Sequence, residues 1–211
     1  MKLILLGSTG LVGNEVLKLA LNDSRVEKVI ALGRSDPQVK HDKLISVHVD
    51  FNHLSDDKTL WDGDAVICAL GTTIKKAGTK EKFQDVDKKY PLEVAKKAFR
   101  NGVNCFVLNS AMGANPRSSI FYNRTKGEVE EELKAVGFSS LVLVRPGLIG
   151  GERNEFRLGE EIGKKVIKFL TPILPIKWQI NPARIIAKTM LEEAIKRQKG
   201  VRIITSESLV H

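Results

Sequence analysis

The sequence predicts a single α/β domain in which helices cover both faces of a doubly wound parallel β-sheet. Short apolar segments alternate with stretches of helical periodicity along the chain, as in repeated β-α-β units. Segment 65–69 is apolar at every position, which is typical of a parallel strand buried on both faces. A chain of 211 residues without a linker rich in serine or glycine leaves little room for a second domain.

Each expected element follows from such a pattern. The strands are expected at residues 2–6, 28–32, 44–49, 65–69, 105–108, 141–144 and 201–205. The helices are expected at residues 10–21, 55–60, 87–101, 122–136, 159–169 and 182–197. Because parallel strands end at one common edge of the sheet, ligands in such folds bind at that edge. The predicted architecture is therefore Rossmann-like.

The composition excludes several classes of protein. The net charge is +9, but basic residues are interleaved with acidic ones and aromatic residues are few, unlike a base-stacking nucleic-acid surface. We therefore expect an anionic small ligand and no specific nucleic acid. No apolar run approaches the ~18 residues of a membrane span, and Met1 and Lys2 lead directly into a strand without a secretory cleavage site.

The two cysteines, Cys68 and Cys105, lie in apolar strand-like segments. We expect buried, reduced thiols. Neither the cysteines nor the four histidines are spaced like metal ligands, so no metal is expected. These features predict a cytoplasmic protein.

A glycine-rich loop lies between the first strand and the first helix. Its spacing is G-x-x-G-x-x-G, at Gly7, Gly10 and Gly13. The first glycine permits a tight turn, the second lets the backbone approach a pyrophosphate, and the third lets helix and strand pack closely. The helix N-terminus then presents free amides and the positive end of its dipole to the anion. A plain β-α turn is the alternative. The expected cofactor contacts are Gly7, Ser8, Thr9, Gly10, Leu11, Val12 and Gly13.

The end of the second strand indicates which dinucleotide binds. A carboxylate there would bind the ribose hydroxyls of NAD, whereas an arginine favours the 2′-phosphate of NADP. The strand ends in Gly33, Arg34 and Ser35, with Asp36 as the competing residue. Since a guanidinium can bind a phosphate with two hydrogen bonds, NADP(H) is preferred over NAD(H). A solvated loop arginine is the alternative.

The ends of the third and fourth strands add further expected contacts. The carboxylate of Asp50, followed by Phe51, could accept a hydrogen bond from the adenine amino group. A helix N-cap or an Asx turn explains Asp50 equally well. After the fourth strand, a glycine lets the loop backbone lie along the cofactor, and Thr72 can reach a ribose or phosphate. This loop consists of Ala69, Leu70, Gly71 and Thr72.

Three residues could carry the chemistry. Ser110 follows the fifth strand, and Tyr122 and Lys126 are four residues apart on one face of the next expected helix. A phenol with a pKa of about 10 is a poor proton shuttle at neutral pH, and a neighbouring ammonium stabilises its ionised form. The lysine can also hold the nicotinamide ribose, so Tyr122 and Lys126 are expected cofactor contacts as well. A surface tyrosine beside a surface lysine is the alternative.

Several motifs in the same order are found in a known superfamily. They are the glycine loop and the segments L-G-T-T, N-S-A-M-G-A, Y-N-R-T-K-G-E-V-E and R-P-G, at residues 70–73, 109–114, 122–130 and 145–147. Together they resemble the short-chain dehydrogenase/reductase superfamily, and most closely its Tat-interacting-protein-like atypical branch. That branch consists of small NADP(H)-binding proteins.

The resemblance implies the triad Ser110, Tyr122 and Lys126. It also implies that the segment after the sixth strand, including Pro146 and Leu148, flanks the nicotinamide. Two features depart from the usual pattern: the Asn-Ala-Gly loop after the fourth strand is replaced by residues 69–72, and no obvious asparagine follows in the next helix to complete a proton relay.

The C-terminal third is expected to shape a substrate pocket. Within the single domain, we expect residues 1–149 to form the cofactor-binding core. Residues 150–211 are expected to form pocket or lid elements and the last strand. The apolar segment 166–178 contains two prolines. We expect a pocket wall there, with a self-association patch or a membrane-surface contact as alternatives.

The leading interpretation is an NADP(H)-dependent oxidoreductase that acts on a small carbonyl or alcohol compound. Its competitor is an NADP(H)-sensing regulator or scaffold with little catalysis, because members of the branch are better known as regulators. A nucleotide-sugar epimerase shares the triad but fits Arg34 and the short C-terminal region poorly. A homodimer is compatible with each of these interpretations.

Overall fold

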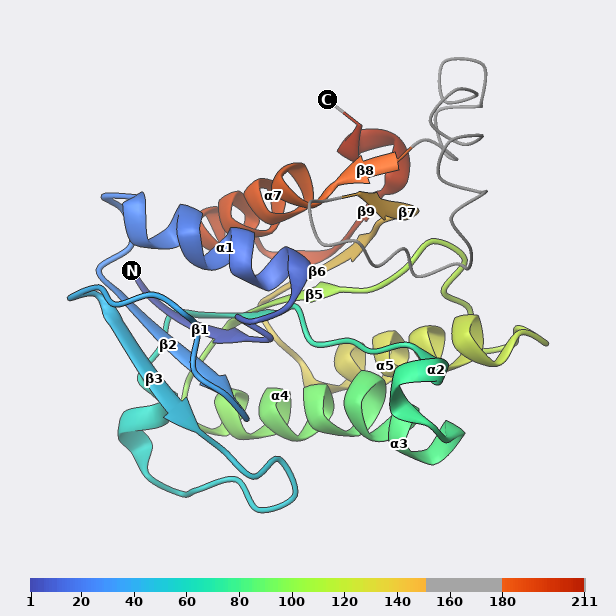
Figure 1. Cartoon of the computed structure of the whole chain (residues 1–211), viewed down its shortest axis with the longest axis horizontal. Coiled ribbons are helices and arrows are strands. Elements are labelled where there is room, and N and C mark those ends of the chain that lie inside the picture. Colours follow the sequence, from blue (N-terminus) through green and yellow to red (C-terminus); the bar gives the residue numbers. More distant parts are fainter. Residues whose placement is uncertain (151–179, 211) are drawn as a thin grey trace.

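A seven-stranded sheet forms the centre of the computed structural model, which describes residues 1–150 and 180–210 (Figure 1). The strand order is β3-β2-β1-β4-β5-β6-β9, and every neighbouring pair is parallel. The predicted doubly wound fold is therefore confirmed. The strands are β1 (Lys2–Leu6), β2 (Lys28–Gly33), β3 (Leu44–His48), β4 (Ala65–Cys68), β5 (Cys105–Asn109), β6 (Ser140–Arg145) and β9 (Gly200–Thr205).

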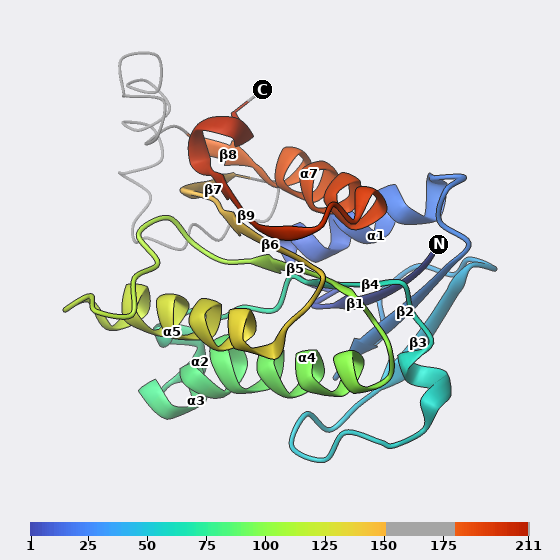
Figure 2. The same ribbon diagram turned by 180° about the vertical axis from the view of Figure 1, so that it is seen from behind.

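Helices cover both faces of the sheet (Figures 1 and 2). On one face, α1 (Leu11–Asn22) packs beside α7 (Ala183–Lys196). On the other face lie α4 (Tyr90–Arg100) and α5 (Phe121–Val136). Because side chains alternate between the faces of a strand, β1, β4 and β5 contribute residues to both apolar cores. The continuously apolar strands are thus explained by two covered faces.

The chain changes direction in the sheet between β1 and β4. From β1 it builds outward through β2 and β3, and from β4 it builds to the opposite side. In open α/β sheets, ligands bind at the carboxyl ends of the strands at such a switch point. The glycine loop and the loop after β4 both lie at this edge.

The short elements were the least predictable. The expected helix at 55–60 is a 3₁₀ turn, η1 (Lys58–Trp61), and the expected helix at 87–101 begins as a π-helix, η2 (Asp85–Lys89). Five further short elements were not predicted: α2 (Ile74–Ala77), α3 (Lys80–Gln84), β7 (Leu148–Gly150), β8 (Ile180–Pro182) and the 3₁₀ turn η4 (Ser206–Leu209). Elements of three to five residues are too short to show a period. The expected helix at 159–169 and the apolar segment 166–178 lie outside the described residues.

Within residues 1–150 and 180–210, no helix is both long and apolar enough to cross a membrane.

Candidate dinucleotide-binding and catalytic site

Two glycines of the N-terminal loop are required by the packing of the protein itself. Gly7 has a φ of +80°, and a Cβ there would lie 2.7 Å from the carbonyl carbon of Ala69. A Cβ at Gly13 would lie 2.0 Å from the carbonyl oxygen of Gly7. The loop after β1 therefore contacts both the loop after β4 and helix α1 too closely for any side chain.

Gly10 differs, because the described part of the chain leaves most of the space beside it unfilled. A Cβ there would meet only the carbonyl oxygen of Gly7, at 3.2 Å, and the backbone at Gly10 is extended. Gly10 is the N-cap of α1, and no side chain caps this helix end. The amides of the first turn are thus available to an anion. This open cradle fits the pyrophosphate of a dinucleotide.

The remaining residues of the loop differ in what they can offer a ligand. Ser8 and the side chain of Val12 are buried, Val12 in the core beneath α1, so Val12 can contribute only its backbone amide. Leu11 and Thr9 are partly exposed at the helix end. The expected contacts of this loop are therefore mainly backbone contacts.

The two competing residues after β2 have different surroundings. Arg34 is exposed and forms no ion pair within the described part of the chain. The carboxylate of Asp36 accepts a hydrogen bond from Ser46 at 2.5 Å and lies 3.2 Å from His48. Asp36 is thus engaged by β3, while the guanidinium is free for a phosphate.

The residues after β3 are held by local contacts. The carboxylate of Asp50 contacts His53 at 2.9 Å and accepts the amide of Asn52 at 2.9 Å, and these hydrogen bonds lower its pKa below the ordinary value. This is the Asx turn that the sequence left open. The Phe51 ring is buried and stacks on Tyr90 with centroids 5.0 Å apart. Only the backbone of Phe51 remains for a ligand, and the adenine contact stays a prediction.

The loop after β4 is fixed at both ends. The amide of Ala69 donates to the carbonyl of Leu6 at 3.0 Å, so β4 and β1 stay paired beyond the strand. The amide of Thr72 donates to the carboxylate of Asp87 at 2.8 Å. Leu70 and Gly71, between these anchors, are partly exposed at the sheet edge.

Ser110 is almost fully buried and already hydrogen-bonded. Its hydroxyl donates to Glu130 of α5 at 2.5 Å. The same carboxylate accepts two hydrogen bonds from the guanidinium of Arg145, at the end of β6. These bonds raise the pKa of Arg145 above its ordinary value. Because a paired carboxylate only accepts, the Ser110 hydroxyl proton is committed to Glu130, and its oxygen can act toward a ligand as an acceptor.

Tyr122 and Lys126 contact the two helical segments that precede α4, namely α3 and the π-helix η2. The Tyr122 ring packs against buried Phe83 with centroids 5.7 Å apart. The Lys126 ammonium lies 2.8 Å from the Asp87 carboxylate in an ion pair whose side chains are 2% and 0% exposed. The two residues therefore lie one turn apart on α5, as the sequence suggested, with partners that it did not identify. Their joint action with Ser110 stays a prediction.

The segment after β6 is bound to neighbouring loops. The carbonyl of Pro146 accepts the amide of Met112 at 2.8 Å, and the amide of Gly147 donates to Asn181 at 2.7 Å. Leu148 pairs with Ile180 in the two-stranded sheet of β7 and β8. Pro146 therefore lies next to the loop after β5, and Leu148 lies two residues further on, in the sheet of β7 and β8.

An unpaired acceptor lies in the same region. Asn109 ends β5 and is 4% exposed, and its side-chain oxygen has no hydrogen-bond partner within the described part of the chain. Buried amide oxygens are rarely left without a donor. This acceptor at the carboxyl edge fits a bound ligand that carries a donor.

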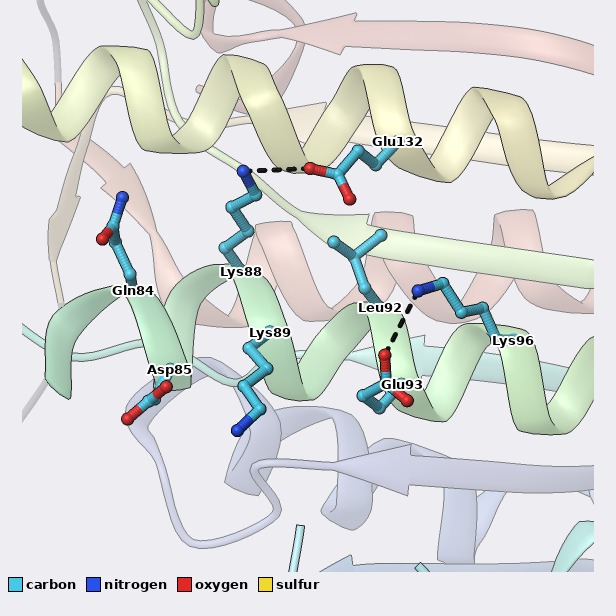
Figure 3. A pocket seen from close by; sticks show the side chains of 8 residues that line it. All are labelled: Gln84, Asp85, Lys88, Lys89, Leu92, Glu93, Lys96 and Glu132. Atoms are coloured by element: carbon cyan, nitrogen blue, oxygen red, sulfur yellow. Dashed lines mark hydrogen bonds and ion pairs between the residues drawn. The ribbon is translucent and has the colours of Figure 1, made fainter. Parts of the chain in front are cut away.

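A shallow cavity of about 370 Å³ lies elsewhere, on the outer side of α4 and α5 (Figure 3). Four of its charged side chains already pair with one another, with Lys88 2.9 Å from Glu132 and Lys96 3.2 Å from Glu93. None of the strand-end residues lines it. We therefore do not assign the cofactor to this cavity.

The cysteines offer no nucleophile. Cys68 and Cys105 are free thiols buried in the sheet, and burial raises the pKa of Cys68 to about 12. Within residues 1–150 and 180–210, no cluster of three histidine, cysteine or acidic side chains could hold a metal ion.

Sequence reasoning missed the charged residues that surround the triad. Asp87, Glu130 and Arg145 all have buried or half-buried partners. One signal was present: Tyr122, Lys126 and Glu130 follow each other at four-residue intervals, so all three share one face of α5. This spacing places Glu130 on the buried face of α5, but it does not identify Asp87 as the partner of Lys126 or Arg145 as the partner of Glu130.

The sequence matches a known family. Residues 7–166 match the family described as NAD(P)H-binding. A relative named protein fmp52, mitochondrial, from Aspergillus niger is 34% identical over 212 residues, which covers 93% of this chain and 88% of the relative. The protein FMP52, mitochondrial, from Candida albicans is 34% identical and covers 79% of this chain and 75% of the relative.

Solved structures share the fold. MoeE5, in complex with UDP-glucose and NAD, has a TM-score of 0.74 at 14% identity and covers 96% of this chain and 75% of its own. The oxidoreductase ylbE from Lactococcus lactis has a TM-score of 0.67 at 19% identity, covering 100% of this chain and 95% of its own. The resemblance to short-chain dehydrogenase/reductase proteins is confirmed at the level of an NAD(P)-binding domain.

One prediction from the sequence is wrong. The expected reduced cysteines suggested a cytoplasmic protein, whereas the relatives from Aspergillus niger, Candida albicans and Meyerozyma guilliermondii are named mitochondrial. Reduced, buried thiols do not distinguish these compartments, so the composition could not have decided the question.

Proposed function

This chain belongs to the NAD(P)H-binding family, and we propose that it is an NADP(H)-dependent oxidoreductase acting on a small carbonyl or alcohol compound. The observation that carries the proposal is the open cradle at Gly10, at the N-terminus of α1 and at the switch point of the sheet. The packing of the protein requires glycine at positions 7 and 13, whereas a Cβ at Gly10 would meet only the Gly7 carbonyl oxygen among the described residues, so the space there suits a ligand.

Each end of the dinucleotide has residues suited to it. The first-turn amides of α1 would bind the pyrophosphate, and the free guanidinium of Arg34 would bind the 2′-phosphate. Lys126 would hold the nicotinamide ribose, with loop 69–72 and the segment containing Pro146 and Leu148 on either side. When bound, the cofactor supplies or accepts a hydride.

Residues of the chain would transfer the proton that accompanies the hydride. Tyr122 would donate a proton to a carbonyl oxygen, or remove one from a hydroxyl, depending on the direction of the reaction. Because the Ser110 proton is committed to Glu130 at 2.5 Å, the Ser110 oxygen would accept a hydrogen bond from the substrate hydroxyl or from the phenol. A Ser110 oxygen that accepts a hydrogen bond suits an alcohol substrate, because a hydroxyl can donate one.

A second function has an observation in its favour. The Lys126 ammonium is compensated by Asp87, and the Ser110 hydroxyl is engaged by Glu130. In a protein that only senses NADP(H), the Lys126 and Ser110 side chains would stabilise the fold through these contacts and would take no part in catalysis. The two proposals share the cofactor site and differ in what Tyr122 does.

The cofactor assignment predicts a difference in thermal stabilisation. NADPH is expected to raise the melting temperature more than NADH at equal concentration, because only NADPH carries a phosphate for Arg34. At 100 times the dissociation constant the rise is about 5–10 °C for a domain of this size. The Arg34→Ala variant is expected to lose this advantage, while Lys40→Ala, which removes an exposed lysine from the same loop, keeps it. An equal shift with both cofactors would contradict the NADP(H) assignment.

The catalytic assignment predicts a loss of turnover without a loss of binding. Tyr122→Phe is expected to lower the rate of NADPH oxidation with an active carbonyl compound by about 100-fold or more. Its NADPH affinity is expected to stay nearly unchanged, because the phenyl ring still packs against Phe83. The measurement is absorbance at 340 nm over a panel of small carbonyl compounds, with calorimetry for affinity. If the wild-type protein binds NADPH and reduces no compound in the panel, the sensor function gains support; full activity in Tyr122→Phe would remove Tyr122 from proton transfer.

A further inference from the structure

The buried carboxylate of Asp87 joins two parts of the proposed site that are far apart in the chain. One oxygen accepts the amide of Thr72, in the loop after β4, at 2.8 Å. The other lies 2.8 Å from the ammonium of Lys126, on α5. The ammonium contact is an ion pair rather than an aligned hydrogen bond. Asp87 itself is 1% exposed, so no water competes for either contact.

The turn that carries Asp87 is a π-helix between α3 and α4. In η2 the amide of Tyr90 donates to the carbonyl of Asp85, five residues earlier. A π turn adds one residue to the α-helical repeat and is frequently found at functional sites. Here Asp87 is buried while its neighbours on either side, Val86 and Lys88, are partly exposed.

The same turn is bound to α5 on its outer side. Lys88 lies 2.9 Å from both Glu128 and Glu132 of α5, and Figure 3 shows the Lys88 side chain reaching toward Glu132. Two consecutive residues thus attach η2 to α5: Asp87 through its buried contact with Lys126, and Lys88 through its partly exposed contacts with Glu128 and Glu132. Asp87 is therefore held in place against Lys126.

We propose that Asp87 is a positioning residue that sets the location of Lys126 and of loop 69–72 together, so that the nicotinamide half of the dinucleotide meets a preassembled surface. One acceptor holds two donors, and both donors belong to groups that face the cofactor in the proposed function, on which this inference rests. Without the carboxylate, the buried Lys126 ammonium loses the counter-charge of Asp87 and the Thr72 amide loses its charged acceptor, so neither group is held as firmly in its place.

The adenosine half of the dinucleotide provides an internal control. The glycine loop and Arg34 follow β1 and β2. Gly7 contacts the start of the loop after β4, where the amide of Ala69 is held by the carbonyl of Leu6, whereas Asp87 holds the far end of that loop at Thr72. A loss of the carboxylate should therefore weaken a complete dinucleotide but not its adenosine fragment. A general loss of folding would weaken both.

The test compares Asp87→Asn with Asp85→Asn, which removes a partly exposed carboxylate from the same π turn. Binding of NADPH and 2′,5′-ADP, and of NADH and ADP, is measured by calorimetry, with thermal unfolding as the report on folding. We expect Asp87→Asn to weaken binding of the dinucleotide that the wild type binds by about 10- to 100-fold, as for the loss of one charged contact. The fragments are expected to change by less than about twofold, and Asp85→Asn to bind both like the wild type.

The outcomes separate this inference from the function on which it rests. Equal losses for dinucleotide and fragment, or an Asp87→Asn variant that binds like Asp85→Asn, would overturn the positioning role and leave the oxidoreductase proposal standing. A wild-type protein that binds no dinucleotide would overturn both.

A second variant covers the case in which Asp87→Asn does not fold. The double substitution of Asp87→Leu and Lys126→Met replaces the buried pair by apolar side chains, an exchange that buried ion pairs often tolerate. This protein is expected to bind NADPH no more tightly than 2′,5′-ADP. Wild-type affinity for NADPH in the double variant would overturn the proposal.

Discussion

Replacing Gly10 with alanine is expected to weaken dinucleotide binding by about 100-fold or more, equivalent to ~2.7 kcal/mol, while the protein stays folded. The backbone at Gly10 is extended, with φ −77° and ψ 168°, so alanine can adopt it. The new methyl group would meet only the carbonyl oxygen of Gly7, at 3.2 Å. It would instead occupy the space that the pyrophosphate needs. Calorimetry with NADPH and NADH measures the loss.

The control for this prediction is another glycine of the same loop. Gly13→Ala would place a Cβ 2.0 Å from the Gly7 carbonyl oxygen, so we expect it to lower the melting temperature by about 5 °C or more. Gly10→Ala should cost about 1 kcal/mol or less, as for glycine to alanine at an N-cap. If Gly10→Ala binds dinucleotide normally, or unfolds as readily as Gly13→Ala, the loop is a plain β-α turn.

Much of the fold could be predicted from the sequence because its signals are local. The strand β1 matches its expected bounds, and most other expected strands and helices lie within one residue of the observed ends. The buried side of a helix or strand determines where apolar residues recur, so the spacing of apolar residues in the sequence predicts the element. The glycine loop could also be predicted, because its three glycines are regularly spaced between a strand and a helix. The structure explains two of them, Gly7 and Gly13, by close backbone contacts.

The charged surroundings of the triad were not predictable in the same way. Asp87 lies in a stretch rich in charged residues, and such a stretch normally forms a solvated helix face. The π turn rotates this carboxylate inward, and no periodicity in the sequence marks an inserted residue. Glu130 and Arg145 are 15 residues apart and meet only because α5 packs against the end of β6. Their pairing depends on tertiary contact.

Glu130→Gln is expected to lower the free energy of unfolding by about 2–4 kcal/mol, one of the largest effects of any single substitution in this site. The Glu130 carboxylate is 1% exposed and accepts hydrogen bonds from both Ser110 and Arg145. An amide can offer one acceptor oxygen, so one of these donors would face an NH₂ group, and the half-buried guanidinium would lose its counter-charge. For a domain of this size the melting temperature should fall by about 4–16 °C, as measured by calorimetry or circular dichroism.

The neighbouring Glu131 supplies the matched control. Its carboxylate is 55% exposed and pairs with Lys134 three residues later, at 2.7 Å. Glu131→Gln should therefore change the free energy of unfolding by less than about 0.5 kcal/mol, because exposed ion pairs contribute little. Equal melting temperatures for the two variants would show that Glu130 is solvated and that the Ser110 hydroxyl is free to donate to a substrate. A large difference would instead mean that the buried Glu130–Arg145 pair holds Ser110, and that Ser110 meets its ligand as an acceptor.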